Sequence, residues 1–339
     1  MRSGPTPKRL LTILTALMLL AGTNALTAAA SPRNDDSSGD AGATYSNPTG
    51  LDTIEWLPNR PADYRILYGD SPLTFGDLRL PERAPGRDGY PVVVFMHGGQ
   101  WESSWSLSYT DQLVEALTRA GVATWSLEYS RRNNPGGGWP GTFLDVANGT
   151  DYLRELDKKF PLDLDRTVAM GHSSGGTLAL WLAGRDQLPA DSELYMSNPL
   201  PIHSVVDLAG VLDFDLALQA GRDDVLQLLG VETAEQAAER FDDASPRHLL
   251  PLGVPQHLII GTLDADWRND IHRRYTEAAR AAGDDVELTV LEGANHFDVV
   301  DVCGPAWAVV VNAVFSHLDE EPSPGAFKWP SRHVCQSRG

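Results

Sequence analysis

The sequence predicts an α/β domain built on a mostly parallel β-sheet with helices on both faces. After residue 50, short apolar runs alternate with segments of helical periodicity, a pattern typical of strands joined by crossover helices. Several runs, such as residues 92–96, contain no polar side chain, as expected of strands that are buried on both faces. With 42% hydrophobic and 22% charged residues, the composition excludes a disordered chain, a collagen-like repeat and a coiled coil.

Each predicted element follows from an apolar run or from helical periodicity. The predicted strands are residues 62–68, 91–96, 122–128, 167–170, 204–208, 256–260 and 286–291. The predicted helices are residues 110–120, 143–159, 175–183, 270–282 and 305–318. Residues 213–250 contain two or three short acidic helices between strands, and we expect them to form a small cap over a site. The predicted domain covers residues 51–320.

The first 30 residues have the three parts of a secretory signal peptide. The positive n-region contains Arg2, Lys8 and Arg9. The apolar run covers residues 10–21, and the small residues of the cleavage site are residues 28–30. The apolar run is shorter than the ~20 residues of a membrane-spanning helix; an uncleaved signal anchor is the alternative. Residues 31–50 indicate a polar linker. The sequence therefore predicts a secreted protein with no stable membrane span after cleavage.

The two cysteines, Cys303 and Cys335, both lie near the C-terminus. In an exported protein an even pair predicts a disulfide. The closed loop of 33 residues would be worth about 3.5 kcal/mol in the chain-entropy model, and it would tie down the tail over residues 321–339. Two free thiols are the alternative. Because neither cysteine belongs to a C-x-x-C pair or stands beside a histidine cluster, we expect no zinc site.

The chain is acidic, with 27 Lys and Arg against 46 Asp and Glu and a formal charge of −19. Removing residues 1–30 takes away three cations and no acid, which leaves −22. Such a chain lacks the basic surface of a nucleic-acid binder and is not attracted to anionic lipid. We therefore expect neither nucleic acid nor an anionic membrane among its partners.

The strongest local motif is G-H-S-S-G at residues 171–175, directly after a predicted strand and before a predicted helix. A G-x-S-x-G motif in that context predicts a nucleophile elbow. The serine of an elbow sits in a strained turn, so the residues around it must be small, as Gly171, Gly175 and Gly176 are. The motif predicts Ser173 as a nucleophile; the alternative is a serine that only caps the helix.

A second motif, His97-Gly98-Gly99, ends the predicted strand over residues 91–96. It predicts the oxyanion-hole loop that lies upstream of an elbow. We expect the backbone N–H groups of Gly98 and Gly99 to point toward a developing alkoxide, with a further donor from Ser174, the residue after the nucleophile. A simple Gly-Gly turn is the alternative.

The acid and the base of a triad should follow the serine in the order acid, histidine. Asp264 follows the strand predicted over residues 256–260, and His296 follows the next strand. Both therefore lie at the same edge of the sheet as the elbow. There His296 could take the proton of Ser173, and Asp264 could fix the imidazole tautomer. Asp266 is the alternative acid.

The remaining motifs supply surroundings rather than chemistry. His97 and His172 flank the predicted site and are interpreted as loop anchors. No H-E-x-x-H or similar ligand cluster predicts a metal, and the Gly-rich stretch at residues 133–139 lacks the Lys-Ser or Lys-Thr of a phosphate loop. Trp101, Trp139 and Trp267 follow predicted strands and are candidates for an aromatic-lined substrate pocket; the alternative is that they pin these loops.

Together, the motifs at residues 97–101, 171–176 and 296–297 resemble those of the α/β-hydrolase superfamily, over roughly residues 51–318. They are most similar to the branch that contains arylformamidases and feruloyl- or acetylxylan-type carboxylesterases. The resemblance implies an eight-stranded, mostly parallel sheet and no cofactor. It also implies a catalytic triad of Ser173, Asp264 and His296. The implied oxyanion hole consists of Gly98, Gly99 and Ser174.

Two features depart from the formamidase pattern and favour an esterase. Gln100 stands where such formamidases usually carry a bulky aromatic residue, and the chain has an export signal whereas those enzymes are usually intracellular. We therefore expect an exported serine carboxylesterase that acts on a small-molecule or polymer-linked ester. An amidase, a peptidase or an arylformamidase on the same triad is the alternative, and a non-catalytic binding protein on this fold is a more distant one.

Overall fold

The centre of the structure is an eight-stranded sheet with the strand order β1-β2-β4-β3-β5-β6-β7-β8. The computed structural model describes residues 49–55, 60–318, 320–327, 330–331 and 335. The signal peptide predicted over residues 1–30 and nearly all of the predicted linker lie outside the described residues. β1 pairs with β2 and β2 with β4 in antiparallel fashion, and all other neighbours are parallel. The prediction of a mostly parallel α/β sheet is therefore confirmed.

The strands agree with the apolar runs of the sequence, with one exception. They are β1 (Tyr64–Leu67), β2 (Phe75–Arg79), β3 (Tyr90–Met96), β4 (Ala123–Leu127), β5 (Leu162–His172), β6 (Ser204–Leu208), β7 (Gln256–Gly261) and β8 (Val286–Leu291). β2 was not predicted because it carries two charges, Asp77 and Arg79. Both are buried, and each is paired: Asp77 accepts two hydrogen bonds from Arg65, and Arg79 lies 2.9 Å from Asp111.

The α-helices are α1 (Leu51–Glu55), α2 (Asp111–Ala120), α3 (Gly141–Asp151), α4 (Leu153–Asp157), α5 (Ser174–Gly184), α6 (Phe214–Gln219), α7 (Asp224–Leu229), α8 (Ala234–Ala238), α9 (Phe241–Ala244), α10 (Asp266–Ala282) and α11 (Ala306–Phe315). Short 3₁₀ turns are η1 (Leu107–Thr110), η2 (Arg185–Gln187), η3 (Pro246–Leu249) and η4 (Asp298–Val300). The single helix predicted over residues 143–159 is divided into α3 and α4. α10 begins at Asp266, earlier than the predicted 270.

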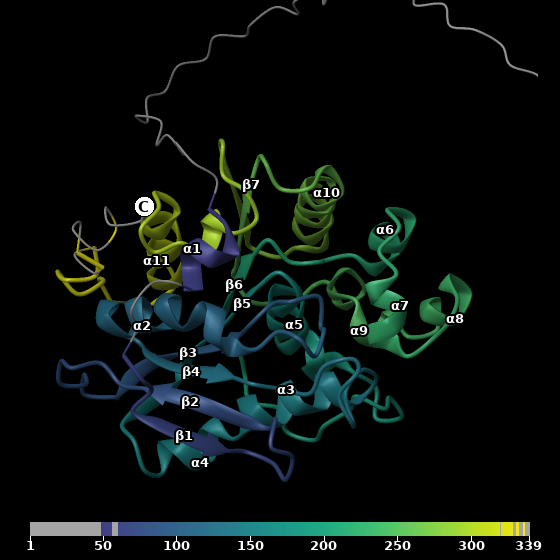
Figure 1. The fold of residues 1–339 in the computed structure, drawn as a ribbon. Helices are drawn as coiled ribbons and strands as arrows, with labels where there is room; N and C mark the ends of the chain where they lie inside the picture. The colour runs from purple at the N-terminus through teal and green to yellow at the C-terminus, as the bar shows by residue number, and fades with distance from the viewer. Residues whose placement is uncertain (1–48, 56–59, 319, 328–329, 332–334, 336–339) are drawn as a thin grey trace, which may run out of the picture. The chain divides into compact units, whose positions relative to one another are not determined.

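The helices cover both faces of the sheet (Figure 1). Side chains of β3 alternate between the two cores that these helices form with the sheet. Val92, Val94 and Met96 point into the core beneath α3, α5 and α10, whereas Val93 and Phe95 point into the core beneath α2 and α11. All seven residues of β3 are buried. A strand covered on both faces reads as a continuous apolar run, which is why its sequence predicted it so directly.

Residues 213–250 form four short helices and one 3₁₀ turn, rather than the two or three helices expected. α6 to α9 lie together to the right of α5 in Figure 1, in the green part of the ribbon. The side chain of Asp213 caps the N-terminus of α6, because it accepts a hydrogen bond from the N–H of Leu216. The indole N–H of Trp181, in α5, donates a hydrogen bond to the carbonyl of Asp243. The segment is thus anchored to α5.

Cys303 and Cys335 form the predicted disulfide, with their Cα atoms 5.5 Å apart. The bond connects the turn before α11 to the far end of the chain. In the part of the chain that the structure describes, no helix has the length and apolar character to cross a membrane.

Candidate active site

Ser173 occupies the turn between β5 and α5 in a strained backbone conformation. Its φ of 55° and ψ of −125° lie outside the regions that L-residues favour. The turn is held in place because the N–H of Ser173 donates to the carbonyl of Leu208, 2.7 Å away, at the end of β6. Strain that a tight network maintains in this way is a feature of functional sites.

The glycines around Ser173 are required by close contact. A Cβ on Gly171 would lie 2.2 Å from the carbonyl oxygen of Gly175, and a Cβ on Gly175 would lie 2.1 Å from that of Met96. A Cβ on Gly176 would lie 1.9 Å from Oδ1 of Asp207. All three positions therefore exclude larger residues, as the motif predicted.

Asp264 and His296 meet although they are far apart in the sequence. Oδ2 of Asp264 lies 2.7 Å from Nδ1 of His296. Asp264 follows β7, His296 follows β8 and Ser173 follows β5, so all three stand at the carboxyl edge of the parallel strands. The alternative acid Asp266 is exposed at the first turn of α10, and the carboxylate that accepts the hydrogen bond from Nδ1 of His296 is that of Asp264.

The electrostatics of this pair favour an ionised acid and a neutral base. Burial raises the pKa of Asp264, but the hydrogen bond from His296, its charge and that of Arg268 together lower it well below its usual range. Burial lowers the pKa of His296, and Arg268 lowers it further, against the opposing effect of Asp264. With Nδ1 bonded to the carboxylate, Nε2 is the nitrogen left to accept a proton.

His172, the residue before Ser173, joins the elbow to the histidine loop. Its Nε2 lies 2.9 Å from the carbonyl oxygen of His296, and the two rings lie 4.7 Å apart. Burial lowers the pKa of His172 well below its ordinary value, and the positive charge of His296 acts in the same direction. A neutral imidazole that donates through Nε2 must accept at Nδ1, and the acceptor faces the hydroxyl of Tyr109 at 2.8 Å.

The oxyanion-hole prediction needs one correction. The N–H of Gly98 donates to the hydroxyl of Tyr109 at 2.7 Å, so this N–H already has an acceptor. Gly98 is small for a different reason: a Cβ there would lie 2.6 Å from that hydroxyl and 2.9 Å from Cβ of Ser173. Ser174 is the first residue of α5, and the first N–H groups of a helix have no intrahelical acceptor. The N–H groups of Gly99 and Ser174 therefore stay as the predicted donors.

His97 anchors the same loop, as interpreted from the sequence. Its ring is fully buried, stacks on Tyr129 with centroids 4.6 Å apart, and has Nδ1 2.7 Å from the carbonyl of Gly98. Burial lowers the pKa of His97 to about 3, with a further contribution from Arg131. The ring is therefore neutral at any pH near 7 and supports the loop.

The three tryptophans proposed as pocket residues have different positions. Trp101 is completely buried and lies edge-on to Phe214, so it pins its loop and lines no pocket. Trp139 is partly buried and donates to Glu193. Trp267 belongs to α10 and not to a loop, because that helix starts earlier than predicted.

Two residues of the site had no motif to identify them, Tyr109 and Arg268. Tyr109 lies in η1, a turn with no periodicity of its own. Arg268 lies in the first turn of α10, and Asp264 lies two residues before that helix begins. No signal in the sequence indicated Arg268, because the helix was expected to begin only at residue 270.

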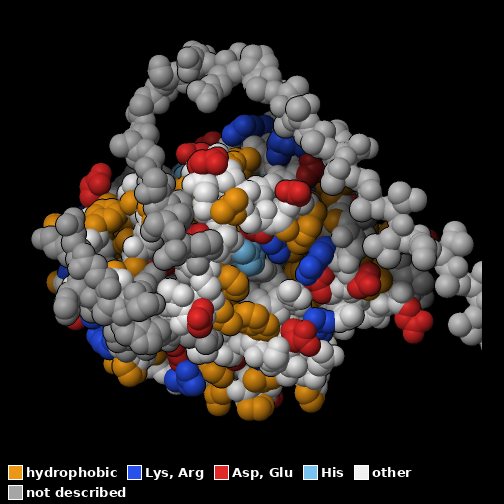
Figure 2. Space-filling view, turned by 45° about the horizontal axis from the view of Figure 1, so that its top comes forward, with side chains coloured by type: hydrophobic (Ala, Val, Ile, Leu, Met, Phe, Trp, Pro, Cys, Tyr) orange, Lys and Arg blue, Asp and Glu red, His pale blue; other side chains and the backbone are white. Residues whose placement is uncertain are grey.

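On the face shown in Figure 2 a histidine side chain is visible near the centre, surrounded by hydrophobic and charged side chains of both signs. The side chain of His296 is 24% exposed, and Ser173 is 5% exposed. Among the described residues, no group of three or more His, Cys, Asp or Glu side chains is arranged to hold a metal ion.

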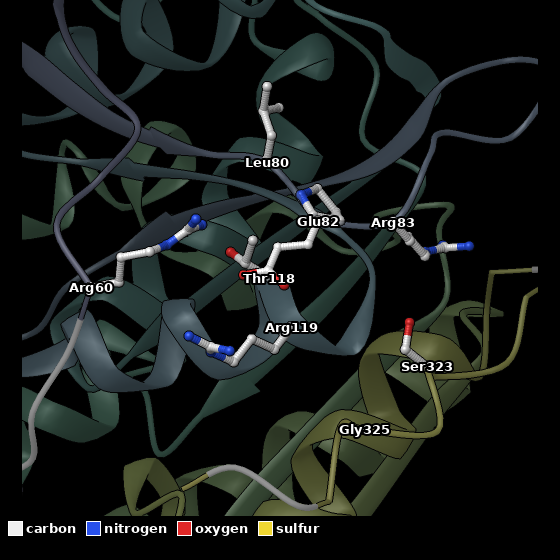
Figure 3. A pocket seen from close by; sticks show the side chains of 9 residues that line it. Arg60, Leu80, Glu82, Arg83, Thr118, Arg119, Ser323 and Gly325 are labelled. Atoms are coloured by element: carbon white, nitrogen blue, oxygen red, sulfur yellow. The ribbon is translucent and has the colours of Figure 1, made fainter.

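A separate cavity of about 390 Å³ lies against the C-terminal end of α2 (Figure 3). α2 ends just before β4 begins, so this cavity is at the amino edge of the parallel strands, away from Ser173. Three arginines line it, and each has a carboxylate partner: Arg60 and Arg119 contact Glu115, and Arg83 contacts Glu320. Its lining provides no nucleophile–base pair.

Comparison with known proteins identifies related sequences and folds. The family model BD-FAE matches residues 77–266, more than half of the 339-residue chain. Esterase 2 of Thermogutta terrifontis, in a propionate-bound structure, is 21% identical with a TM-score of 0.61 over 77% of this chain and 95% of that one. No curated protein matches the sequence.

Two further solved structures share the fold. A truncated carbohydrate esterase from gut microbiota is 18% identical, with a TM-score of 0.65 over 75% of this chain and 94% of that chain. Esterase B from Lactobacillus Rhamnosis (HN001) is 18% identical, with a TM-score of 0.64 over 78% of this chain and 89% of its own. The predicted α/β-hydrolase fold is confirmed.

Proposed function

This chain belongs to the BD-FAE family and is a carboxylesterase-type α/β-hydrolase, and from that premise we propose that it cleaves esters through an acyl-enzyme formed on Ser173. The observation that carries the proposal is the hydrogen-bonded pair of Asp264 and His296, 2.7 Å apart, at the same edge of the sheet as the strained Ser173 turn. A nucleophile, a base and an acid that orients the base are the parts such a reaction needs.

In the proposed reaction, Oγ of Ser173 attacks the ester carbonyl while Nε2 of His296 takes its proton. The N–H groups of Gly99 and Ser174 hydrogen-bond the oxyanion. Collapse of the tetrahedral intermediate breaks the bond to the alcohol oxygen, which receives the proton from His296. Water, deprotonated by the same imidazole, then attacks the acyl carbonyl. Collapse of this second intermediate breaks the bond to Oγ of Ser173, which takes back the proton from His296 as the acid is released, while ionised Asp264 stabilises the imidazolium in both steps.

We further propose that residues 213–250 form a cap beside the site. Phe214 of α6 contacts Trp101 of the oxyanion loop edge-on, with centroids 6.1 Å apart. This contact joins the segment to the loop that carries Gly98 and Gly99. The proposed substrate is a small-molecule or carbohydrate-linked ester, since one protein of similar fold is described as a carbohydrate esterase.

We also propose that the protein is exported, with residues 1–30 removed as a signal peptide. The disulfide between Cys303 and Cys335 supports this location, because such bonds persist in oxidising compartments and are rare in the cytosol.

The test is hydrolysis of p-nitrophenyl acetate by the chain from Ser31 onward, measured beside Ser173→Ala. We expect turnover by the parent and a loss of about 10⁴-fold or more in the variant. Ser316→Ala, at the end of α11, is the matched control and should retain the parent rate. Equal rates in the parent and in Ser173→Ala would contradict the proposal, and turnover of the matching p-nitroanilide alone would indicate an amidase.

A further inference from the structure

Arg268 lies beneath the acid–base pair and contacts both of its members. It lies in the first turn of α10, four residues after Asp264, and its Nη1 is 2.5 Å from Oδ1 of Asp264 and 3.4 Å from Nδ1 of His296. The residue is 8% exposed, so this charge lies inside the protein. Oδ1 of Asp264 also accepts from the N–H of Ala265 at 2.7 Å. One carboxylate oxygen is thus held by α10, and the other faces the imidazole.

The guanidinium of Arg268 is held from its other side by an aromatic ring. Its Cζ lies 4.4 Å from the centroid of Trp267, and Arg222 stacks on the same ring at 5.1 Å. Arg222 is fixed in turn by two hydrogen bonds to Asp224 at the start of α7. The stack of Arg222, Trp267 and Arg268 therefore connects the segment proposed as a cap to the acid of the triad.

The backbone of Arg268 is also tied to the core. Its carbonyl oxygen lies 2.9 Å from Nδ1 of His272, whose Nε2 lies 2.8 Å from Oδ2 of Asp207. Asp207 and His272 are fully buried. With the backbone, the aromatic face and the carboxylate all engaged, Arg268 has a defined position in the site.

Burying an arginine costs free energy that a paired carboxylate recovers only in part. Stability alone is therefore a weak explanation for a charge at this position. Its contacts indicate an effect on the reaction, since a fixed positive charge beside an imidazole opposes protonation of that imidazole. The charged and titratable groups that face His296 are Asp264, Arg268, His172 and His272; Asp264 is the one that favours the protonated form.

We propose that Arg268 is a positioning residue of the esterase site, which holds Asp264 by one oxygen and keeps His296 in its neutral, proton-accepting form into mildly acidic solution. The inference rests on the proposed function, since it assigns Arg268 a role in that triad.

The sign of the pH effect follows from the contacts. The base works when it is unprotonated, and burial together with Arg268 lowers the pKa of His296 below its ordinary value of 6.5. The acid limb of kcat/KM should therefore lie below pH 6.5 in the parent. Without Arg268 the imidazole loses a repelling charge, so the limb should move upward by about 1 pH unit.

The test is the profile of kcat/KM against pH, from pH 4 to 8, for p-nitrophenyl acetate. The variants are R268Q, R268M, which keeps the volume without polar atoms, and R268K, which keeps the charge. We expect the limb to rise in R268Q and R268M and to stay nearer the parent in R268K. Arg280→Gln is the control on the same helix, because Arg280 donates to the carbonyl of Val286, the first residue of β8, at the other end of α10 from Asp264; its limb should match that of the parent.

A purely structural role would lower the rate without moving the limb. An unmoved limb in a folded R268Q or R268M would overturn the proposal, and so would a parent limb at or above pH 6.5. If neither variant folds, the position of the acid limb in the parent still tests the proposal. Failure of the triad itself is distinguished by Ser173→Ala: an active parent that depends on Ser173 but shows no shift contradicts only the role of Arg268.

Discussion

Replacing Tyr109 with phenylalanine tests whether the oxyanion loop is positioned through a tyrosine. The hydroxyl of Tyr109 accepts the N–H of Gly98 at 2.7 Å and donates to Nδ1 of His172 at 2.8 Å. Burial raises the pKa of Tyr109, so the hydroxyl keeps its proton and can serve as donor and acceptor at once. Through His172 the same chain of hydrogen bonds reaches the carbonyl of His296.

The size of the effect follows from the two partners that Tyr109→Phe leaves behind. An unsatisfied buried donor or acceptor costs about 1–3 kcal/mol, so the loss of stability for both should be about 2–6 kcal/mol. Removing an oxyanion donor outright costs about 10²–10³ in kcat. Because Tyr109 acts on the loop through Gly98 and touches no substrate, we expect a smaller loss, about 10- to 100-fold in kcat, with KM little changed.

The assays are denaturant unfolding and steady-state hydrolysis of p-nitrophenyl acetate. Tyr275→Phe is the matched control: Tyr275 is equally buried, and its hydroxyl donates to Gln256 at the amino end of β7, away from the site. We expect this control to lose stability and keep kcat. An unchanged kcat in Tyr109→Phe would refute the reasoning. So would a gain, because a gain would mean that the N–H of Gly98, once released, serves the oxyanion directly.

Two further predictions concern the elbow and the disulfide. Gly171→Ala would place a Cβ 2.2 Å from the carbonyl oxygen of Gly175, so we expect the free energy of unfolding to fall by about 1–3 kcal/mol or more and turnover to be lost. Gly325→Ala, which has open space around it, is the control and should change neither. Retained activity in Gly171→Ala would show that the turn can relax. Replacing both Cys303 and Cys335 with serine should lower the free energy of unfolding by at most about 3.5 kcal/mol and leave kcat unaltered, as checked by chemical denaturation; a fall in kcat would show that the disulfide supports the site.

The strands could be predicted from the sequence where their buried residues are apolar. β3, β7 and the second half of β5 contain mainly apolar residues, and the elbow motif specifies its own steric requirements, so these could be predicted. β2 could not, because its charged residues Asp77 and Arg79 are buried only through partners on other elements. No pattern within five residues contains the information that Arg65 and Asp111 will neutralise them.

In the candidate site, too, some features could be predicted from the local sequence and others depend on residues of distant segments. Ser173, Asp264 and His296 follow strands, and their positions come from topology. The error at Gly98 has another cause: its N–H faces a hydroxyl contributed by a turn between β3 and α2. A glycine motif predicts that the backbone approaches closely, but it does not predict which N–H groups remain free of an acceptor.

The pocket tryptophans show what position after a strand can and cannot predict. It predicts a loop at the carboxyl edge of the sheet, but not the direction of the side chain: Trp101 is completely buried, which agrees with the alternative that it pins its loop. Trp267 is the second residue of α10, and its ring lies 4.4 Å from Cζ of Arg268. A role for these residues in binding substrate stays a prediction.

Tyr109 and Arg268 solve the same physical problem at two ends of the site. A neutral imidazole must face the serine while its other nitrogen stays bonded to a carboxylate, and a loop must present free N–H groups without collapsing onto the elbow. Arg268 fixes the carboxylate from behind, and Tyr109 occupies the N–H of Gly98 that would otherwise be unpaired in the core. In the proposed reaction, both act by satisfying groups that the reaction does not use, which leaves Nε2 of His296 to accept the proton of Ser173 and the N–H groups of Gly99 and Ser174 to bind the oxyanion. Preorganisation of this kind costs no rearrangement when charge develops in the transition state, so the two substitutions should affect kcat more than KM.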